Sequence, residues 1–216
     1  MVANQKNKKV IVYDNLKKRI IANSLKSGDP LNEGLLSNEL KTSKTPVREA
    51  LQQLEKEGFV ENIPGKGAFV SRFSFQDIRE LFEIREMLEI GAIRKAVARG
   101  DLNLAEAKAI RAKFVSSESS GNRTARNYFN AGDQIHTFII DSLGNRQLIE
   151  YYGRLQEHIV RMRLHFFNQV DQERSERSFK EHLEIIDAMV AQDTVKAEEA
   201  LRDHLRNSVE YLKNKI

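Results

Sequence analysis

The prolines of this chain are confined to its first third. They are Pro30, Pro46 and Pro64, and the 144 residues after position 72 contain none. Because proline removes a backbone donor and breaks helix interiors, only the second part is free to form long, uninterrupted helices. We therefore expect a mainly α-helical protein, with a small mixed domain over residues 1–72 and an all-helical domain over residues 73–216.

The proline-free part repeats its apolar residues at helical spacing, with few turn signals between the repeats. Its start, Ser74-Phe-Gln-Asp77, places a hydroxyl and a carboxylate where each can cap the other's backbone donor. Six helices fit between the turn signals, approximately over residues 74–98, 103–118, 122–143, 145–168, 175–191 and 194–213. This pattern predicts a helical bundle.

In residues 1–72 the pattern of apolar and polar residues changes every few positions. The expected order is a helix over 13–22, a second over 33–40, a third from Thr45-Pro46 to a stop at Gly58, and a strand, turn and strand over 59–63, 64–67 and 68–70. Glycine suits the left-handed residue that ends a helix. Helix, helix, turn, helix and hairpin is the order of a winged helix-turn-helix domain, so we predict this α+β fold for the first part.

The positive charge of the chain is concentrated in the same part. Residues 1–72 contain 13 Lys and Arg against 8 Asp and Glu, whereas the rest contains 22 against 23. Such an excess is expected of a domain that meets a polyanion, although a charged stretch is also the usual composition of a plain solvated face.

The third predicted helix has an outer face suited to DNA. Thr45, Arg48 and Gln52 follow one another at spacings of three and four residues, with Lys44 beside them at the helix start. Arginine can read a guanine edge, and the N-terminus of a helix attracts phosphate. Lys66, between two glycines, can bring the hairpin tip close to a groove or backbone. The alternative is an ordinary exposed face of a small domain.

The segment LNEGLLSNELKTSKTPVREALQQLEKEGFVENIPGKGAFV resembles the DNA-binding domain of the GntR family of bacterial transcription regulators. The helices after it resemble the FCD-type ligand domain of the FadR subfamily, in its six-helix, VanR-like group. The resemblance implies operator contacts by Lys44, Thr45, Arg48 and Gly67, and a wing contact by Lys66.

Two positions depart from the family pattern. Lys44 stands where the family usually has arginine, and lysine cannot reproduce the planar, two-pronged contact of a guanidinium. Lys41 stands in the turn where the family often has glycine, which matters if this position needs a positive φ.

Histidines in the helical part form a candidate metal site. His136, His182 and His204 lie in the apolar stripes of three different predicted helices, and Asp133 shares a helix face with His136. One aspartate and three histidines suit a divalent transition metal such as Zn²⁺, Ni²⁺, Mn²⁺ or Fe²⁺, with Zn²⁺ or Ni²⁺ favoured. A histidine in an apolar stripe can also be an ordinary core residue.

The resemblance to the FCD family supports the metal interpretation. It implies that His136, His182 and His204 bind a metal inside the bundle together with an aspartate. The family's aspartate usually precedes the first histidine by four residues, where this chain has Gly132. Asp133 lies one residue later and is the candidate for the fourth ligand.

Two arginines are candidates for binding an effector. Arg85 and Glu89 interrupt an apolar stripe at a spacing that permits a structural ion pair. Within REMLE they match a family segment that faces the ligand cavity, so Arg85 could instead bind a carboxylate. Arg161 belongs to a polar stripe that either faces solvent or lines the cavity.

Several functional classes are excluded or unsupported. A chain without cysteine has no disulfide, thiolate nucleophile or Cys-ligated metal site. No apolar run reaches the length of a membrane span, and the polar start MVANQKNKK lacks the apolar centre of a signal peptide, so we expect a cytoplasmic protein without membrane contact. None of the five histidines follows a glutamate by three residues, as a di-iron bundle requires, and no P-loop or nucleophile elbow is present.

The sequence therefore predicts a transcription regulator and not an enzyme. We expect a homodimer, most simply a repressor, that binds a pseudo-palindromic double-stranded operator and responds to a small organic or sugar acid held at or near the metal. A regulator that senses the metal directly is the alternative, and a helical-bundle metalloenzyme is a weaker one.

Overall fold

The structure, a computed structural model, describes residues 2–119, 125–166 and 172–215. The chain forms two compact units, one of residues 1–73 and 157–165 and the other of residues 74–156 and 166–216. The division after residue 73 lies next to the expected domain boundary at residue 72. The short segment 157–165 belongs to a helix of the second part of the sequence, yet it groups with the first unit.

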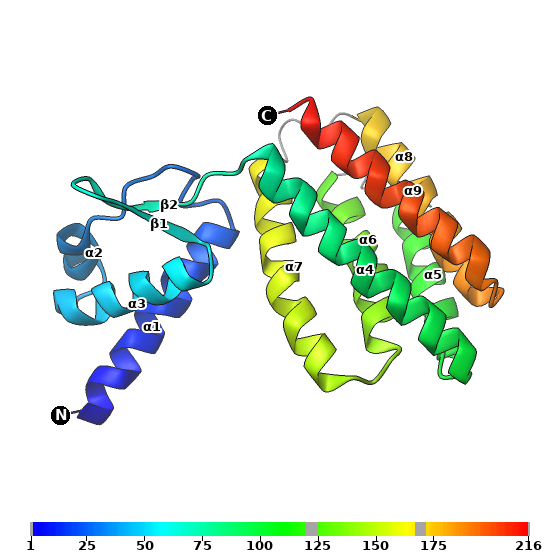
Figure 1. Ribbon diagram of the computed structural model, residues 1–216, viewed down its shortest axis with the longest axis horizontal. Coiled ribbons are helices and arrows are strands. Elements are labelled where there is room, and N and C mark those ends of the chain that lie inside the picture. Colours follow the sequence, from blue (N-terminus) through cyan, green and yellow to red (C-terminus); the bar gives the residue numbers. More distant parts are fainter. Residues whose placement is uncertain (1, 120–124, 167–171, 216) are drawn as a thin grey trace. The chain divides into compact units, whose positions relative to one another are not determined.

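The first unit has the element order of a winged helix-turn-helix (Figure 1). Its elements are α1 (Val2–Ile21), α2 (Glu33–Glu39), α3 (Lys44–Lys56), β1 (Val60–Ile63) and β2 (Gly67–Val70). The two strands pair antiparallel, with Val60 opposite Val70 and Ile63 opposite Gly67. The fold class predicted for this part of the chain is confirmed.

The core of the first unit forms where α1 packs on α3 against the hairpin. Val12, Leu16 and Ile20 of α1 are each at most 2% exposed and recur every four residues, which places them on one face of the helix. Helix α1 begins much earlier than the predicted range 13–22. Val12 continues the apolar face beyond the predicted start, but residues 4–9 are Asn-Gln-Lys-Asn-Lys-Lys, and such a polar stretch gives no helical periodicity.

Two of the residues with positive φ angles in this unit flank its second and third helices. Gly58 has a φ of 78° directly after α3, as expected for a helix terminator. Lys41, in the turn between α2 and α3, has a φ of 49°. The turn therefore does require a left-handed residue at the position where lysine replaces the family's glycine.

The second unit is built from helices, and α4 begins with the expected capping box. The helices are α4 (Phe75–Arg99), α5 (Leu104–Ser119), α6 (Ala125–Asp141), α7 (Arg146–Phe166), α8 (Gln172–Val190) and α9 (Thr194–Lys213), and residues 157–165 of α7 are the segment that groups with the first unit. The side chain of Ser74 accepts from the Asp77 backbone, and the Asp77 side chain accepts from the Ser74 backbone. Parts of the connections expected between residues 118 and 122 and between residues 168 and 175 lie outside the described residues, as do the adjoining ends of the helices predicted over 122–143 and 145–168.

Helix α8 begins at Gln172, three residues before its predicted start. Residues 172–174 are Gln-Glu-Arg, which favour helices but carry no apolar residue that would mark a periodic stripe. The sequence pattern therefore predicts no helix over residues 172–174, whereas the structure has them in the first turn of α8.

The helices of the second unit pack in neighbouring pairs (Figure 1). Helix α9 lies beside both α4 and α8, and α6 contacts α4, α5 and α8. The rings of Phe114 and Phe179 stack between α5 and α8, with centroids 4.5 Å apart. The buried faces of α4, α6, α8 and α9 thus share one core, in which a few polar side chains are enclosed. Among the described residues, no helix has both the length and the apolar character needed to cross a bilayer.

Candidate metal centre and nucleic-acid interface

Three histidines from three helices meet in the core of the second unit. His136 belongs to α6, His182 to α8 and His204 to α9, and their side chains are 1%, 6% and 4% exposed. One nitrogen of each ring lies within 4.8 Å of the corresponding nitrogen of the other two. The tertiary structure therefore gathers three potential ligand atoms that are far apart in the sequence.

The other ring nitrogen of each histidine faces an oxygen atom. Nδ1 of His136 lies 2.6 Å from Oε2 of Glu89, and Nδ1 of His204 lies 2.8 Å from Oε2 of Glu181. Nδ1 of His182 lies 2.6 Å from the main-chain oxygen of Ser178. Carbonyl and carboxylate oxygens only accept, so Nδ1 donates the proton in each bond.

In a neutral ring whose Nδ1 carries the proton, Nε2 keeps its lone pair. Nε2 of His136 and Nε2 of His182 are 3.1 Å apart, so in the absence of a metal this contact is favourable only when one of the two nitrogens carries a proton. A cation shared by the rings would stabilise this arrangement, and Nδ1 bonded to an oxygen is the usual environment of a metal-ligating histidine.

Burial keeps the imidazoles of His182 and His204 in the neutral state that binds metals. Burial lowers the pKa of His182 well below the ordinary histidine value, and the neighbouring His204 and His136 lower it further. Burial also lowers the pKa of His204 well below that value, with His136 and Arg85 adding to the effect. Both imidazoles are therefore neutral near pH 7, when Nε2 is available as a ligand.

Glu89 lies at the centre of one hydrogen-bonded group. Besides His136, it accepts from Nε of Arg85 at 2.6 Å and from the hydroxyl of Tyr152 at 2.6 Å. Glu89 is 0% exposed and Arg85 is 4% exposed. The positive charge of Arg85 balances a buried carboxylate that holds the His136 ring in place.

Glu181 has the same role at a second histidine. It accepts two hydrogen bonds from Nη1 of Arg174, at 3.1 Å and 3.0 Å, and one from Asn207 at 2.9 Å. Two histidines are therefore each held by a glutamate that is paired with an arginine. Sequence reasoning did not identify Glu181, because it precedes His182 in the chain but orients His204 on another helix.

Gly132 allows one of the rings to reach the cluster. A Cβ atom at this position of α6 would lie 2.6 Å from Nε2 of His182, well inside contact distance. The cluster among the described residues consists of the three histidines and does not include Asp133, the candidate for a fourth ligand. Asp133 lies three residues before His136 on α6 and is half-buried.

The two candidate effector arginines lie in different units. Arg85 forms the ion pair with Glu89 that its spacing allowed, beside the histidine cluster. Burial opposes its charge, but the neighbouring Glu89, Tyr152 and Asp133 raise the pKa of Arg85 above the ordinary arginine value. Arg161 is 4% exposed and therefore does not face solvent.

Arg161 contacts other parts of the first unit. Its guanidinium donates to the main-chain oxygen of Ser71 and lies over the ring of Phe73, with 4.4 Å between the guanidinium carbon and the ring centroid. Burial lowers the pKa of Arg161 to about 10.

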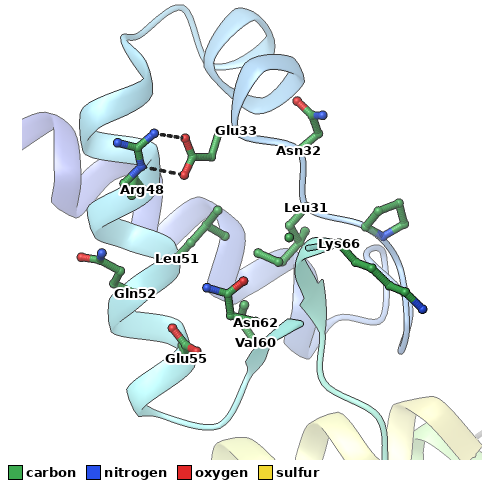
Figure 2. Close-up of a pocket in the computed structure, with 13 residues that line it drawn as sticks. Leu31, Asn32, Glu33, Arg48, Leu51, Gln52, Glu55, Val60, Asn62 and Lys66 are labelled. Atoms are coloured by element: carbon green, nitrogen blue, oxygen red, sulfur yellow. Dashed lines mark hydrogen bonds and ion pairs between the residues drawn. The ribbon is translucent and has the colours of Figure 1, made fainter. Parts of the chain in front are cut away.

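The candidate DNA-contacting residues are exposed on the first unit. Their group comprises Lys44, Thr45, Arg48 and Gln52 of α3, with Lys66 and Gly67 of the hairpin. A groove of about 380 Å³ lies between α3 and the hairpin, and Arg48, Gln52, Lys66 and Gly67 line it (Figure 2). The structure therefore places the predicted base-reading and wing residues along one surface.

Glu33 is a residue of this groove that sequence reasoning missed. Its carboxylate accepts from Nε of Arg48 at 2.8 Å and from Nη2 of Arg48 at 2.7 Å (Figure 2). These hydrogen bonds lower the pKa of Glu33 below the ordinary glutamate value. Glu33 opens α2 and Arg48 lies in α3, so only the packing of the two helices reveals the pair.

Models of two protein families match the chain. The model of the bacterial regulatory proteins of the gntR family matches residues 8–70, and the model of the FCD domain matches residues 80–207. Together they span both structural units. The chain belongs to the GntR family. It is a DNA-binding transcription regulator with a C-terminal FCD domain, and its relatives are regulators and not enzymes.

Individual relatives of this GntR-family regulator agree with the family models. The HTH-type transcriptional repressor GlaR of Escherichia coli is 27% identical over 199 residues, which are 89% of this chain and 90% of GlaR. A GntR-type transcriptional regulator from Rhodococcus sp. RHA1 has a solved structure with a TM-score of 0.74 and 22% identity, covering 97% of this chain and 99% of that chain. The Zn²⁺-bound FCD domain of TM0439 has a TM-score of 0.55 and 22% identity, covering 65% of this chain and 94% of that domain.

Proposed function

We propose that this regulator is a homodimeric repressor whose FCD domain holds a divalent metal and, beside it, a small organic or sugar acid. The observation that carries the proposal is the convergence of three buried histidine nitrogens whose partner nitrogens are all held by oxygen atoms. The repressor role is supported by the name of the related GlaR, and a two-fold dimer calls for a pseudo-palindromic operator. As a chromosome-binding protein it would act in the cytoplasm.

The DNA-reading part of the proposal assigns distinct roles to six exposed residues. Arg48 would read a guanine edge in the major groove, with Gln52 beside it on α3. Lys44 and Thr45 would bind phosphates at the helix start, where backbone donors and the helix dipole already attract anions. Lys66 and Gly67 would contact the backbone or the minor groove from the hairpin tip.

The metal part of the proposal assigns the ligands to His136, His182 and His204. Three neutral imidazoles fit Zn²⁺ or Ni²⁺, and their second nitrogens are already fixed in the tautomer that a ligand needs. The Zn²⁺ bound in the FCD domain of TM0439 supports Zn²⁺ as the first metal to test. Asp133 stays a prediction as the fourth ligand.

The charge of the site supports an anionic effector. His182 and His204 are neutral near pH 7, and the two buried glutamates are each paired with an arginine, Arg85 or Arg174. A bound divalent cation would therefore carry a positive charge that the three imidazoles do not compensate, and it would act as a Lewis acid toward a carboxylate. We assign Arg85, which is linked to His136 through Glu89, to holding that carboxylate, and Arg161 stays a prediction as an effector-binding residue.

An effector can change DNA binding only if it binds one arrangement of the dimer better than another. The metal ligands come from α6, α8 and α9, and their hydrogen-bond partners come from α4 and α8. A ligand at this centre would therefore be close to several helices of one core. If the packing of these helices differs between the two arrangements of the dimer, the ligand would bind one arrangement more tightly than the other.

Metal analysis tests the site directly. We expect the purified full chain to hold about one equivalent of Zn²⁺ per protomer after Zn²⁺ loading and desalting, and the His136→Ala, His182→Ala and His204→Ala triple variant to hold none. His165→Ala is the matched control, because His165 lies outside the cluster. Retention of Zn²⁺ by the triple variant would refute the assignment.

Selection of duplexes from a random pool tests DNA recognition. We expect the full chain to enrich a sequence with an inverted repeat, and Arg48→Ala to abolish its preference for this sequence over a scrambled duplex. Lys56→Ala removes another exposed cation from the same helix and should keep the preference. A wild-type chain that enriches no sequence would contradict the proposed role of α3.

Direct metal sensing is the second candidate function. It is favoured by the burial of the cluster, since three ligands on three helices would couple metal binding to helix packing without any organic ligand. Zn²⁺-dependent affinity for the selected duplex in the absence of any organic acid would favour direct sensing. Affinity that changes only when an acid is added would favour the effector.

A further inference from the structure

Arg48 is held by a carboxylate on the surface that we assign to DNA. Glu33 contacts Nε and Nη2 of Arg48 at 2.8 Å and 2.7 Å, so both oxygens engage the same edge of the guanidinium (Figure 2). The Arg48 side chain is 60% exposed and that of Glu33 is 31% exposed. The pair is thus formed at the surface, and the arginine remains accessible from outside.

The geometry of the pair leaves the outer edge of Arg48 available. A guanidinium has five N–H donors, and Glu33 uses the one on Nε and one of the two on Nη2. Both donors of Nη1 and the second donor of Nη2 remain. These form the end of the guanidinium, which can donate simultaneously to O6 and N7 of a guanine. Glu33 therefore restrains the side chain without occupying the edge that reads a base.

The same carboxylate changes the electrostatics of the groove. The groove is lined by two cations, Arg48 and Lys66, and by two carboxylates, Glu33 and Glu55. Phosphate contacts by free lysine and arginine account for most non-specific DNA affinity. An arginine paired with a carboxylate carries no net charge as a unit, so it contributes little to that affinity.

We propose that Glu33 is a positioning residue for sequence recognition: it orients Arg48 for base reading and suppresses the attraction of Arg48 to phosphates on any sequence. The proposal rests on the proposed function, in which Arg48 reads a base. Glu33 thereby increases the ratio between specific and non-specific affinity, although a negative charge on a DNA-facing surface weakens overall attraction.

The test compares Glu33→Gln with Glu55→Gln in the full-length chain. Glutamine keeps the size of Glu33 but removes its charge and one of its two acceptor oxygens. Glu55 lines the same groove and makes no ion pair among the described residues, so Glu55→Gln removes an equal charge without releasing an arginine. Affinities are measured for the duplex selected by the wild type and for a scrambled duplex of the same composition, at several salt concentrations.

We expect Glu33→Gln to lower the ratio of specific to non-specific affinity about tenfold, the scale of one bidentate base contact. Its affinity for the scrambled duplex should rise, and the salt slope for that duplex should become steeper by about 1, as for one added phosphate contact. Glu55→Gln should raise non-specific affinity and keep most of the discrimination. In an Arg48→Ala background, Glu33→Gln should raise the affinity for the scrambled duplex no more than Glu55→Gln does.

Either of two results would overturn the inference and leave the proposed recognition role of α3 intact. The first is that the wild type selects a duplex and Glu33→Gln keeps the wild-type ratio of specific to non-specific affinity for it. The second is a loss of discrimination in Glu33→Gln that comes with a lower unfolding temperature than that of Glu55→Gln, because Glu33 would then act by stabilising α2. A thermal unfolding curve for each variant separates loss of folding from loss of recognition. If the wild type selects no duplex, the proposed DNA recognition fails and the role of Glu33 fails with it.

Discussion

Glu89 and His136 are joined by a hydrogen bond of 2.6 Å between Oε2 and Nδ1, and their side chains are 0% and 1% exposed. The bond connects α4 to α6 and fixes both the tautomer and the orientation of the imidazole. A glutamate that never touches a metal can in this way determine how well a histidine binds one.

Replacing Glu89 by Gln should weaken metal binding about 10- to 100-fold, the usual effect of losing a carboxylate behind a histidine ligand. The neutral amide no longer increases the basicity of the ring, and Arg85 loses its charge partner. Competition against a chromophoric chelator measures the affinity. The matched control is Glu86→Gln, since Glu86 belongs to the same helix but pairs with Arg202 at the surface. Equal Zn²⁺ affinity in both variants would contradict this role of Glu89.

Replacing Gly132 by Ala should reduce metal affinity even though alanine favours helices. The added Cβ would lie 2.6 Å from Nε2 of His182, so the ring must move away from the cluster. The control is Gly153→Ala, because a Cβ at Gly153 meets no atom within 4 Å. This control should keep its metal and gain about 0.5–1 kcal/mol in unfolding free energy, as expected for Gly→Ala inside a helix. Metal affinity is again read by chelator competition, and an unchanged value for Gly132→Ala would rule out this steric role.

Tyr152 should make the chain less stable at alkaline pH. Burial raises the pKa of Tyr152 well above its ordinary value of 10.0, and the neighbouring Glu89 raises it further. A proton that is held more tightly in the folded state stabilises the fold below the unfolded pKa, and this contribution is lost as the pH rises above about 10. Tyr152→Phe removes this contribution.

Urea unfolding at pH values below and above about 10 measures the effect. The unfolding free energy of the wild type should fall more steeply with pH than that of Tyr152→Phe. Other ionisable groups are common to both proteins and cancel in the difference. Parallel pH profiles would show that Tyr152 does not contribute.

Lys41 should be less favourable than glycine in its turn. Its φ of 49° lies in the left-handed region, which costs a residue with a Cβ about 1 kcal/mol or more. Lys41 is exposed, so its substitution removes no buried contact. We expect the unfolding free energy of Lys41→Gly to exceed that of Lys41→Ala by about 1 kcal/mol. Denaturant titration checks the order, and a more stable alanine variant would contradict it.

The sequence was sufficient for the order of the elements and for the chemical types at both sites. Proline and glycine positions, apolar periodicity and capping residues act within a few residues along the chain, so they predicted the helices, the hairpin and the stop at Gly58. These local signals failed where helices are polar, at the starts of α1 and α8. The resemblance to the family marked position 41 as a turn residue that is often glycine, and the structure gives Lys41 a positive φ there.

Only the tertiary structure decided which side chains meet. Sequence spacing gave three histidines on separate helices, but their convergence depends on how α6, α8 and α9 pack. The partners Glu181 for His204 and Glu33 for Arg48 join residues from different helices, and no periodicity records such a contact. The physical reason is that hydrogen bonds and ion pairs act over a few ångströms in space. Packing of the apolar faces sets those distances. The sequence around a polar residue does not indicate which distant residue it will contact.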